Sequence, residues 1–201
     1  KLAEYCCDNW YKLNMLYDNE EIYDNLRFLS RQYIASIEIQ VQEKVNFSNL
    51  CDLLFPGYYQ LLDENTFILG LEVFKKYYHP EIIINKNQSQ FVTEIDKIAK
   101  KLGHKGAGIT LANKIYNLAL NTLSVSPNNK FSQLSAISCA DALILQIKTS
   151  KEIISNMDEL ARELPEYEEI SNISGCGNKL TSRIIAEIGD IRRFKNAGSL
   201  I

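Results

Sequence analysis

Apolar residues recur every three or four positions along most of this chain, which is the periodicity of amphipathic helices. The first long pattern covers residues 19–55 and stops at Pro56-Gly57, a pair that ends helices. A second long pattern covers residues 131–164. The first helix would be about 50 Å long at roughly 1.5 Å per residue. Helices of this length pair with a second long helix or with another subunit, so the two patterns predict an antiparallel, coiled-coil-like stalk.

Shorter helical patterns fill the sequence between the two long ones. They cover residues 66–78, 89–102 and 109–123, and turns are predicted near residues 85–87 and 103–108. Residues 82–84 form a β-branched run that would suit a short strand, but no second strand is available to pair with it. The predicted fold class is therefore all-α, with two long helices forming the stalk, a small helical block between them and a C-terminal helix-hairpin-helix.

The C-terminal helix-hairpin-helix is predicted from one short motif. Ile173-Ser174-Gly175-Cys176-Gly177 precedes an apolar helical run that contains Leu180, Ile184, Ile185 and Ile188. In such a motif two glycines allow a tight turn, and the next helix presents backbone N–H groups and its positive end to a phosphate. The alternative is a glycine turn between two packed helices that binds no ligand. The candidate nucleic-acid-binding residues are Ser174, Gly175, Gly177, Asn178, Lys179, Arg183, Arg192 and Arg193.

Charge and cysteine content narrow the function classes. The net charge is −3, yet bases outnumber acids from Asn178 onward, so a basic surface would be local. The five cysteines contain no Cys-x-x-Cys pair, which favours reduced thiols and a cytoplasmic protein. No run reaches the roughly 18 apolar residues of a membrane span. No residue is assigned to catalysis or to a metal, because His79 and His104 lack spaced ligand partners and suit surface or capping roles.

Two other features favour structural roles over binding. Gly106-Ala107-Gly108 repeats the Gly-x-Gly spacing, but no apolar residue precedes it, so a loop and a helix start are favoured over a second phosphate-binding turn. The tyrosine pairs at 58–59 and 77–78 could stack on bases. We favour the interpretation that they cover a small helical core.

With these residues laid out, the chain resembles the transposases of insertion sequence family one-hundred-ten and their one-sixteen and nine-oh-two relatives. The resemblance is strongest from Leu164-Pro165 through the glycine turn to the run 185–194, Ile-Ala-Glu-Ile-Gly-Asp-Ile-Arg-Arg-Phe. Within this stretch, Ser174 and Thr181 stand where the helix-hairpin-helix motif usually has proline and alanine, and both are small enough for the turn to form. Residues 26–33 followed by Phe55-Pro56 are similar to the linker helix of that family, and residues 2–5 with Trp10 are similar to the end of its N-terminal domain.

The resemblance implies DNA transposition by a parent protein with a RuvC-like domain, four acidic residues that bind Mg²⁺ and a catalytic serine. It also implies a structured guide RNA and homo-oligomers formed through the long helices. The last acidic residue would precede Leu2-Ala3 and the serine would follow residues 199–201, so we expect an interior, inactive fragment. The expected parts are residues 1–18, the tail of the RuvC-like domain, residues 19–164, the stalk with its block, and residues 165–201, the start of the C-terminal domain.

The predicted function is therefore nucleic-acid backbone binding and oligomerisation within a transposase of a mobile element. DNA, a guide RNA and further copies of the chain are the expected partners, and no membrane is expected. The alternative is a helical dimerisation module with no nucleic-acid affinity of its own. A self-sufficient enzyme is disfavoured, because the sequence offers no catalytic constellation.

Overall fold

The structure is a computed structural model, and it describes residues 4, 5, 7, 21–104, 106–194, 196 and 198. All regular structure in these described residues is helical, which confirms the all-α class. The predicted segment 1–18 lies almost entirely outside the described residues, as do Trp10 and residues 199–201. Among the helices that are described, none is long and apolar enough to cross a membrane.

Both long helices are present. Helix α2 covers Glu21–Leu54 and α7 covers Lys130–Ala161. Helix α2 ends just before Pro56-Gly57, and Gly57 has a φ of +85° that suits a residue without a side chain. Helix α7 ends three residues earlier than the sequence pattern predicts, because residues 162–164 form a turn before Pro165.

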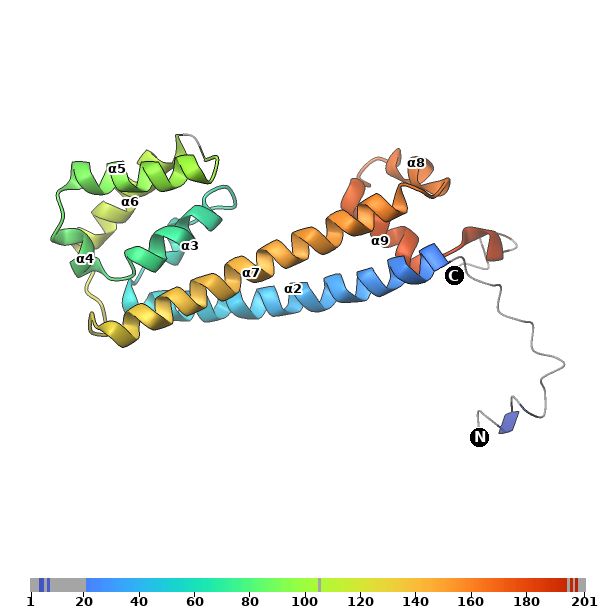
Figure 1. The fold of residues 1–201 in the computed structure, drawn as a ribbon, viewed down its shortest axis with the longest axis horizontal. Coiled ribbons are helices and arrows are strands. Elements are labelled where there is room, and N and C mark those ends of the chain that lie inside the picture. Colours follow the sequence, from blue (N-terminus) through green and yellow to red (C-terminus); the bar gives the residue numbers. More distant parts are fainter. Residues whose placement is uncertain are drawn as a thin grey trace. The chain divides into compact units, whose positions relative to one another are not determined.

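The chain divides into two compact units, which we describe separately (Figure 1). Unit 1 contains Lys1–Ile34 and Lys151–Ile201, and unit 2 contains Ala35–Ser150. The beginning of α2 and the end of α7 therefore belong to unit 1, and the remainder of each helix belongs to unit 2. The coiled-coil stalk and the boundaries predicted at residues 18 and 164 stay predictions.

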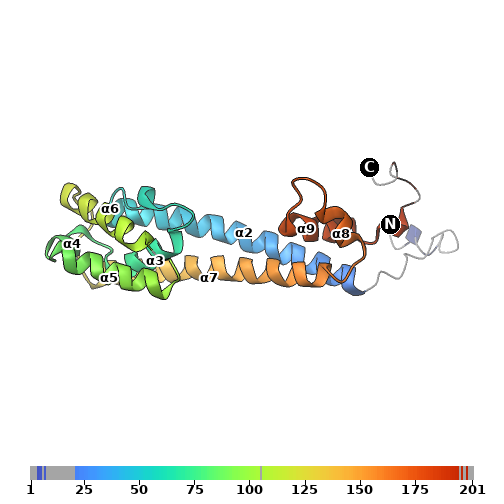
Figure 2. The same ribbon diagram turned by 90° about the horizontal axis from the view of Figure 1, so that it is seen from above.

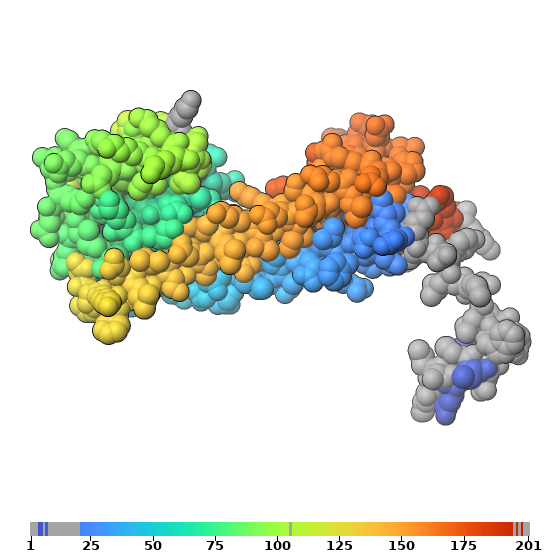
Figure 3. All heavy atoms as spheres, viewed as in Figure 1, coloured from blue at the N-terminus to red at the C-terminus, as the bar shows by residue number. Residues whose placement is uncertain are grey.

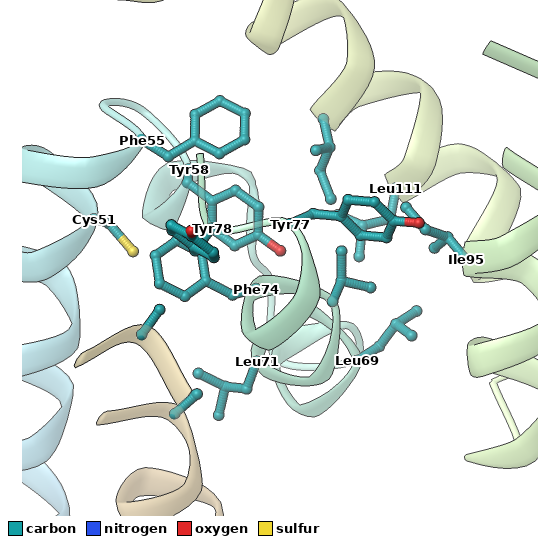
Figure 4. Close-up of a cluster of buried hydrophobic side chains, with 14 of the residues drawn as sticks. Cys51, Phe55, Tyr58, Leu69, Leu71, Phe74, Tyr77, Tyr78, Ile95 and Leu111 are labelled. Carbon is teal, nitrogen blue, oxygen red and sulfur yellow. The ribbon is translucent and has the colours of Figure 1, made fainter. Parts of the chain in front are cut away.

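Unit 2 contains the predicted helical block. Between α2 and α7 lie η2 (Tyr59–Leu61), α3 (Phe67–Lys76), α4 (Pro80–Ile84), α5 (Gln88–Lys101) and α6 (Ala107–Asn121). Figure 4 shows part of the core of this unit, where Phe55, Tyr58, Phe74, Tyr77 and Tyr78 lie in one cluster of buried side chains. Tyr58 and Tyr77 are fully buried there, and the Tyr58 hydroxyl donates to the Gly70 carbonyl at 2.8 Å. These tyrosines therefore cover the core, as the sequence favoured, and are not available for base stacking.

Within unit 2 the two long helices run in opposite directions side by side. The Ser150 hydroxyl near the end of this part of α7 lies 3.1 Å from Oε1 of Gln40 near the start of this part of α2. At the other end of the unit, Leu134 and Leu50 line the same groove. The core holds Phe47, Cys51 and Leu54 of α2 together with Ala136, Ala140, Leu143 and Ile144 of α7.

His79 has the capping role that the sequence suggested, although it is buried and not on the surface. It is the N-cap of α4, and its Nδ1 accepts a hydrogen bond from the Glu81 N–H at 3.2 Å. Its Nε2 lies 3.1 Å from the Ser126 carbonyl, to which it donates in this tautomer. With this cap and Pro80 in the first turn, residues 82–84 form a helix and not the strand that their composition also allowed.

Unit 1 is built from the two remaining helix ends and the C-terminal helices α8 (Glu166–Ser171), α9 (Asn178–Ile188) and η3 (Ile191–Arg193). Its core holds Tyr23, Leu26, Ile154, Met157, Ala161, Leu164, Tyr167, Ile185 and Ala186. Polar contacts fix the C-terminal helices to α2. The Tyr23 hydroxyl donates to Glu166 at 2.6 Å, and the Ser30 hydroxyl donates to Glu187 at 3.2 Å.

Candidate nucleic-acid interface

Helices α8 and α9 are joined by a short exposed turn that contains the glycine motif (Figures 1 and 2). The Ile173 N–H donates to the Ile170 carbonyl at 3.1 Å, and the Cys176 N–H donates to the Ile173 carbonyl at 2.9 Å. Hydrogen bonds within the backbone of the turn therefore stabilise its conformation. Ser174, Gly175, Gly177, Asn178 and Lys179 are all exposed along it, so the structure brings five of the eight candidate residues together.

The two glycines of the turn have different physical reasons to be glycine. Gly175 has a φ of +94°, a region that costs a residue with a side chain roughly 1 kcal/mol or more. Gly177 has a φ of −75° and a ψ of 167°, which any residue adopts, and a Cβ built on it would meet nothing within 4 Å. The sequence motif predicts that both glycines are needed for the backbone conformation of the tight turn. The observed backbone angles agree with that expectation at Gly175 but not at Gly177.

Gly177 is the N-cap of α9, and no side chain caps this helix. The first bonds of the helix run from the Leu180 and Thr181 N–H groups to the Gly177 carbonyl, at 2.8 and 3.0 Å. The N–H groups of Asn178 and Lys179 have no acceptor in the described part of the chain. They point out of the helix start together with its positive dipole end, so they can donate to an anion.

Two cationic side chains follow the turn on α9. Lys179 is exposed and has no ion pair with any described residue. Arg183 lies one turn further along, and its guanidinium sits over the Tyr33 ring of α2, 5.5 Å from the ring centre. Its Nε is buried, with no acceptor among the described residues. A buried charged donor usually has a hydrogen-bond partner. The Arg183 guanidinium is held in place by the Tyr33 ring, but its Nε still lacks a hydrogen-bond acceptor among the described residues.

Arg192 and Arg193 lie at the opposite end of α9, in η3. The eleven residues of α9 separate the two ends by about 16 Å at roughly 1.5 Å per residue. Arg192 donates to Asp190 from both its backbone N–H and its Nε, each at 2.8 Å, and this guanidinium lowers the pKa of the Asp190 carboxyl. Arg193 donates to the Ile188 carbonyl at 2.7 Å and covers the Phe194 ring. The structure therefore does not bring these two arginines to the glycine turn.

The apolar face of α9 differs from the one that the sequence predicts. Leu180 is 42% exposed, and Ile173 before the turn is 57% exposed. The buried positions are Ile185, which the pattern predicted, and the small residues Thr181, Ser182 and Ala186, which it did not. Ile173 and Leu180 are thus exposed apolar residues on either side of the turn, which helix periodicity alone did not indicate.

The described residues are not expected to hold the Mg²⁺ of the parent protein, because the resemblance places its last acidic ligand before Leu2-Ala3. They contain no group of three His, Cys, Asp or Glu side chains placed to hold a metal ion. The Mg²⁺ expected for the parent protein stays a prediction.

Comparison with known protein families gives a match over the region that contains the glycine turn. Residues 167–201 match the family model described as Transposase IS116/IS110/IS902 family. The match contains most of α8, the glycine turn, α9 and η3, and it confirms the resemblance over this part of the chain. No curated protein and no solved structure gives a significant match.

Proposed function

We propose that this chain is part of a transposase and that the α8–α9 turn binds the phosphate backbone of a nucleic acid. The family match over residues 167–201 indicates a transposase-related role. Phosphate binding is supported chiefly by Gly177, which the fold does not require to be glycine. Glycine at such a position suits a close approach of the backbone to a ligand.

The chemistry of the turn favours the backbone over base edges. Two N–H groups without an acceptor, a helix start and the Lys179 ammonium are all donors to a phosphate. Arg183, fixed by Tyr33 one turn away, can provide a second charged donor to the same strand or to the next phosphate. We propose DNA as the ligand, with a guide RNA as a further partner of the parent protein.

Replacing Gly177 by Ser tests this use of the glycine. A serine N-cap accepts from the N–H of the second or third helix residue and stabilises the helix by a few tenths of a kcal/mol relative to glycine. The same side chain stands in front of the helix start and uses an N–H that the phosphate needs. We expect an unchanged or slightly higher melting temperature and roughly tenfold weaker duplex binding at low salt by fluorescence anisotropy.

Gly177→Ala is the matched comparison, because it adds a Cβ without an acceptor for the N–H groups. Weaker binding by both variants would show that space before the helix matters, and weaker binding by Gly177→Ser alone would show that the N–H groups matter. If Gly177→Ser binds the duplex as tightly as the unmodified chain, the turn is a ligand-free connection between packed helices and the proposal is wrong.

We also propose that the long helices form a homo-oligomer, and one face of unit 2 supports this. Phe131, Leu134 and Leu145 of α7 are 79%, 65% and 60% exposed. Leu134 lines a groove of about 600 Å³ between α7 and α2. Phe131 and Leu145 are fourteen residues apart, two heptads, with Ser138 midway. Exposed apolar residues at this spacing fit a partner helix, and Asp141 and Lys148 stand at the positions that follow Leu134 by one and two heptads.

Leu134→Glu combined with Leu145→Glu should convert the oligomer to a monomer. Two carboxylates in a helix seam would be desolvated without a partner, which opposes association. The measurement is molar mass by light scattering after size exclusion, with Leu123→Glu as the control, because Leu123 is 91% exposed and lies in the α6–α7 connection. An unmodified chain that is monomeric at all concentrations would contradict this part of the proposal.

A further inference from the structure

Unit 2 contains a stretch of sequence from which acidic residues are absent. Between Asp96 and Asp141 there is no Asp or Glu, although the whole chain has a net charge of −3. The same stretch contains Lys97, Lys100, Lys101, Lys105, Lys114 and Lys130. Positive charge is therefore concentrated in one part of unit 2 and is not diluted by neighbouring carboxylates in sequence.

Three of these lysines share the outer face of α5. Lys97, Lys100 and Lys101 are spaced by three and four residues, which places them next to one another on a helix surface. All three are exposed, whereas Phe91, Ile95 and Ala99 are buried. Helix α5 lies on the outside of its unit, so this face is open to solvent (Figures 1 and 3). Gln90 and Thr93 continue the face without adding charge.

The carboxylates at the two edges of this face are already paired. Glu94 accepts from Lys76 at 2.7 Å and from Lys86 at 2.9 Å, and it also contacts the Tyr77 hydroxyl. These donors lower the pKa of Glu94 to about 2. At the other edge, Asp96 pairs with Lys100 at 2.6 Å. Two carboxylates are thus held by three lysines.

Lys97 and Lys101 form no ion pair with any described residue, so the outer face of α5 has a net positive charge after every pair is counted. Their ammonium groups are point charges on flexible stems, which match phosphates without selecting bases. The face has no aromatic side chain on which an unpaired base could stack. A duplex backbone therefore fits this face better than a single strand.

We propose that the outer face of α5, centred on Lys97 and Lys101, is a second contact surface for the phosphate backbone of a nucleic-acid duplex. It goes beyond the function proposed for the α8–α9 turn, because it lies in the other unit and uses side-chain charge and not backbone N–H groups. The surface reads no sequence. It adds affinity and salt dependence in proportion to the phosphates that its lysines neutralise.

The test compares Lys97→Gln/Lys101→Gln with Lys130→Gln/Lys148→Gln in the full chain. Both variants remove two exposed lysines of unit 2 that have no ion pair among the described residues. Anisotropy titrations at several salt concentrations use a labelled DNA duplex, an RNA duplex of the same sequence and the single strand. For the α5 variant, the slope of the logarithm of the binding constant against the logarithm of the salt concentration should fall in magnitude by roughly 2. Its affinity for whichever of the two duplexes the unmodified chain binds more tightly should fall on the order of tenfold. Lys97→Arg/Lys101→Arg should retain tight binding, because it keeps both charges.

Several outcomes would overturn this inference. One is an equal loss in the α5 and control variants, which would show that only net charge matters. Another is tighter binding to phosphatidylserine vesicles than to either duplex. If the α5 variant binds like the unmodified chain while Lys179→Gln weakens binding, the turn proposal stands and this one fails. The reverse result supports the α5 surface and contradicts the turn.

Discussion

The chain with Lys179→Gln and Arg183→Met should lose most of its duplex affinity and keep its fold. Lys179 is exposed beside the uncapped start of α9, and Arg183 lies one turn along on the same helix. If each neutralises one phosphate, the salt slope should fall by about 2 and binding near 0.1 M salt should weaken by a factor in the tens. Methionine at 183 keeps an apolar stem against Tyr33, so the melting temperature should change little.

Two comparisons make this result specific. Arg31→Gln/Lys151→Gln removes two exposed basic residues of the same unit that have no ion pair among the described residues, and it should change the slope much less. Arg192→Gln should also have a small effect, because Arg192 is bonded to Asp190 at the far end of α9. If Arg192→Gln weakens binding as much as Lys179→Gln does, the phosphate contacts are not centred on the turn.

The sequence predicted α9 accurately because both ends of the helix have strong signals. A glycine precedes Asn178 and another glycine, Gly189, follows Ile188, and the observed helix Asn178–Ile188 contains the whole predicted apolar run from Leu180 to Ile188. Gly189 has a φ of +69°, and a Cβ there would lie 3.0 Å from an Arg27 nitrogen of α2. The positive φ alone favours glycine at that position, because the guanidinium end of the flexible Arg27 side chain can move aside.

The surroundings of the turn could not be predicted in the same way. Periodicity shows that α9 has an apolar face, but it does not show whether large or small residues form the contact. Here the small residues Thr181 and Ala186 are buried while Leu180 is exposed. The pairing of Arg192 with Asp190 also depends on the η3 turn after α9, which composition does not specify. The sequence therefore predicted a turn before α9, which the structure contains, but its candidate residues included two arginines that lie at the opposite end of α9.

The charge on α5 was missed for a related reason. Net charge over the whole chain hides a local excess, and α5 contains no glycine motif that would indicate phosphate binding. The sign of a helix face depends on which carboxylates are paired. The ion-pair partners of Glu94 are Lys76 and Lys86, which lie outside α5. The sequence alone does not show that these two lysines reach Glu94.

Substitution of Gly108 by Ala should destabilise unit 2, in contrast to the change at Gly177. The two Gly-x-Gly motifs have the same spacing, but Gly108 is buried where α5 and α6 contact each other. A Cβ on Gly108 would lie 2.6 Å from the Ala99 Cβ and 3.0 Å from the Asp96 Cα. The Asp96 Cα is a backbone atom that cannot rotate away as a side chain can, so α5 and α6 must move apart to fit the new methyl group. We expect a loss of about 1–3 kcal/mol in the free energy of unfolding, measured by urea denaturation.

Combining Gly108→Ala with Ala99→Gly gives the sharper measurement, because it returns the space that the new methyl group occupies. Ala99→Gly alone should cost about 1 kcal/mol through helix propensity, yet the double variant should be more stable than the sum of the single effects predicts. A coupling of roughly 1 kcal/mol would identify helix packing as the reason for this glycine. Additive effects, or a Gly108→Ala chain as stable as the original, would contradict that assignment and reopen the phosphate-binding alternative for the second Gly-x-Gly motif.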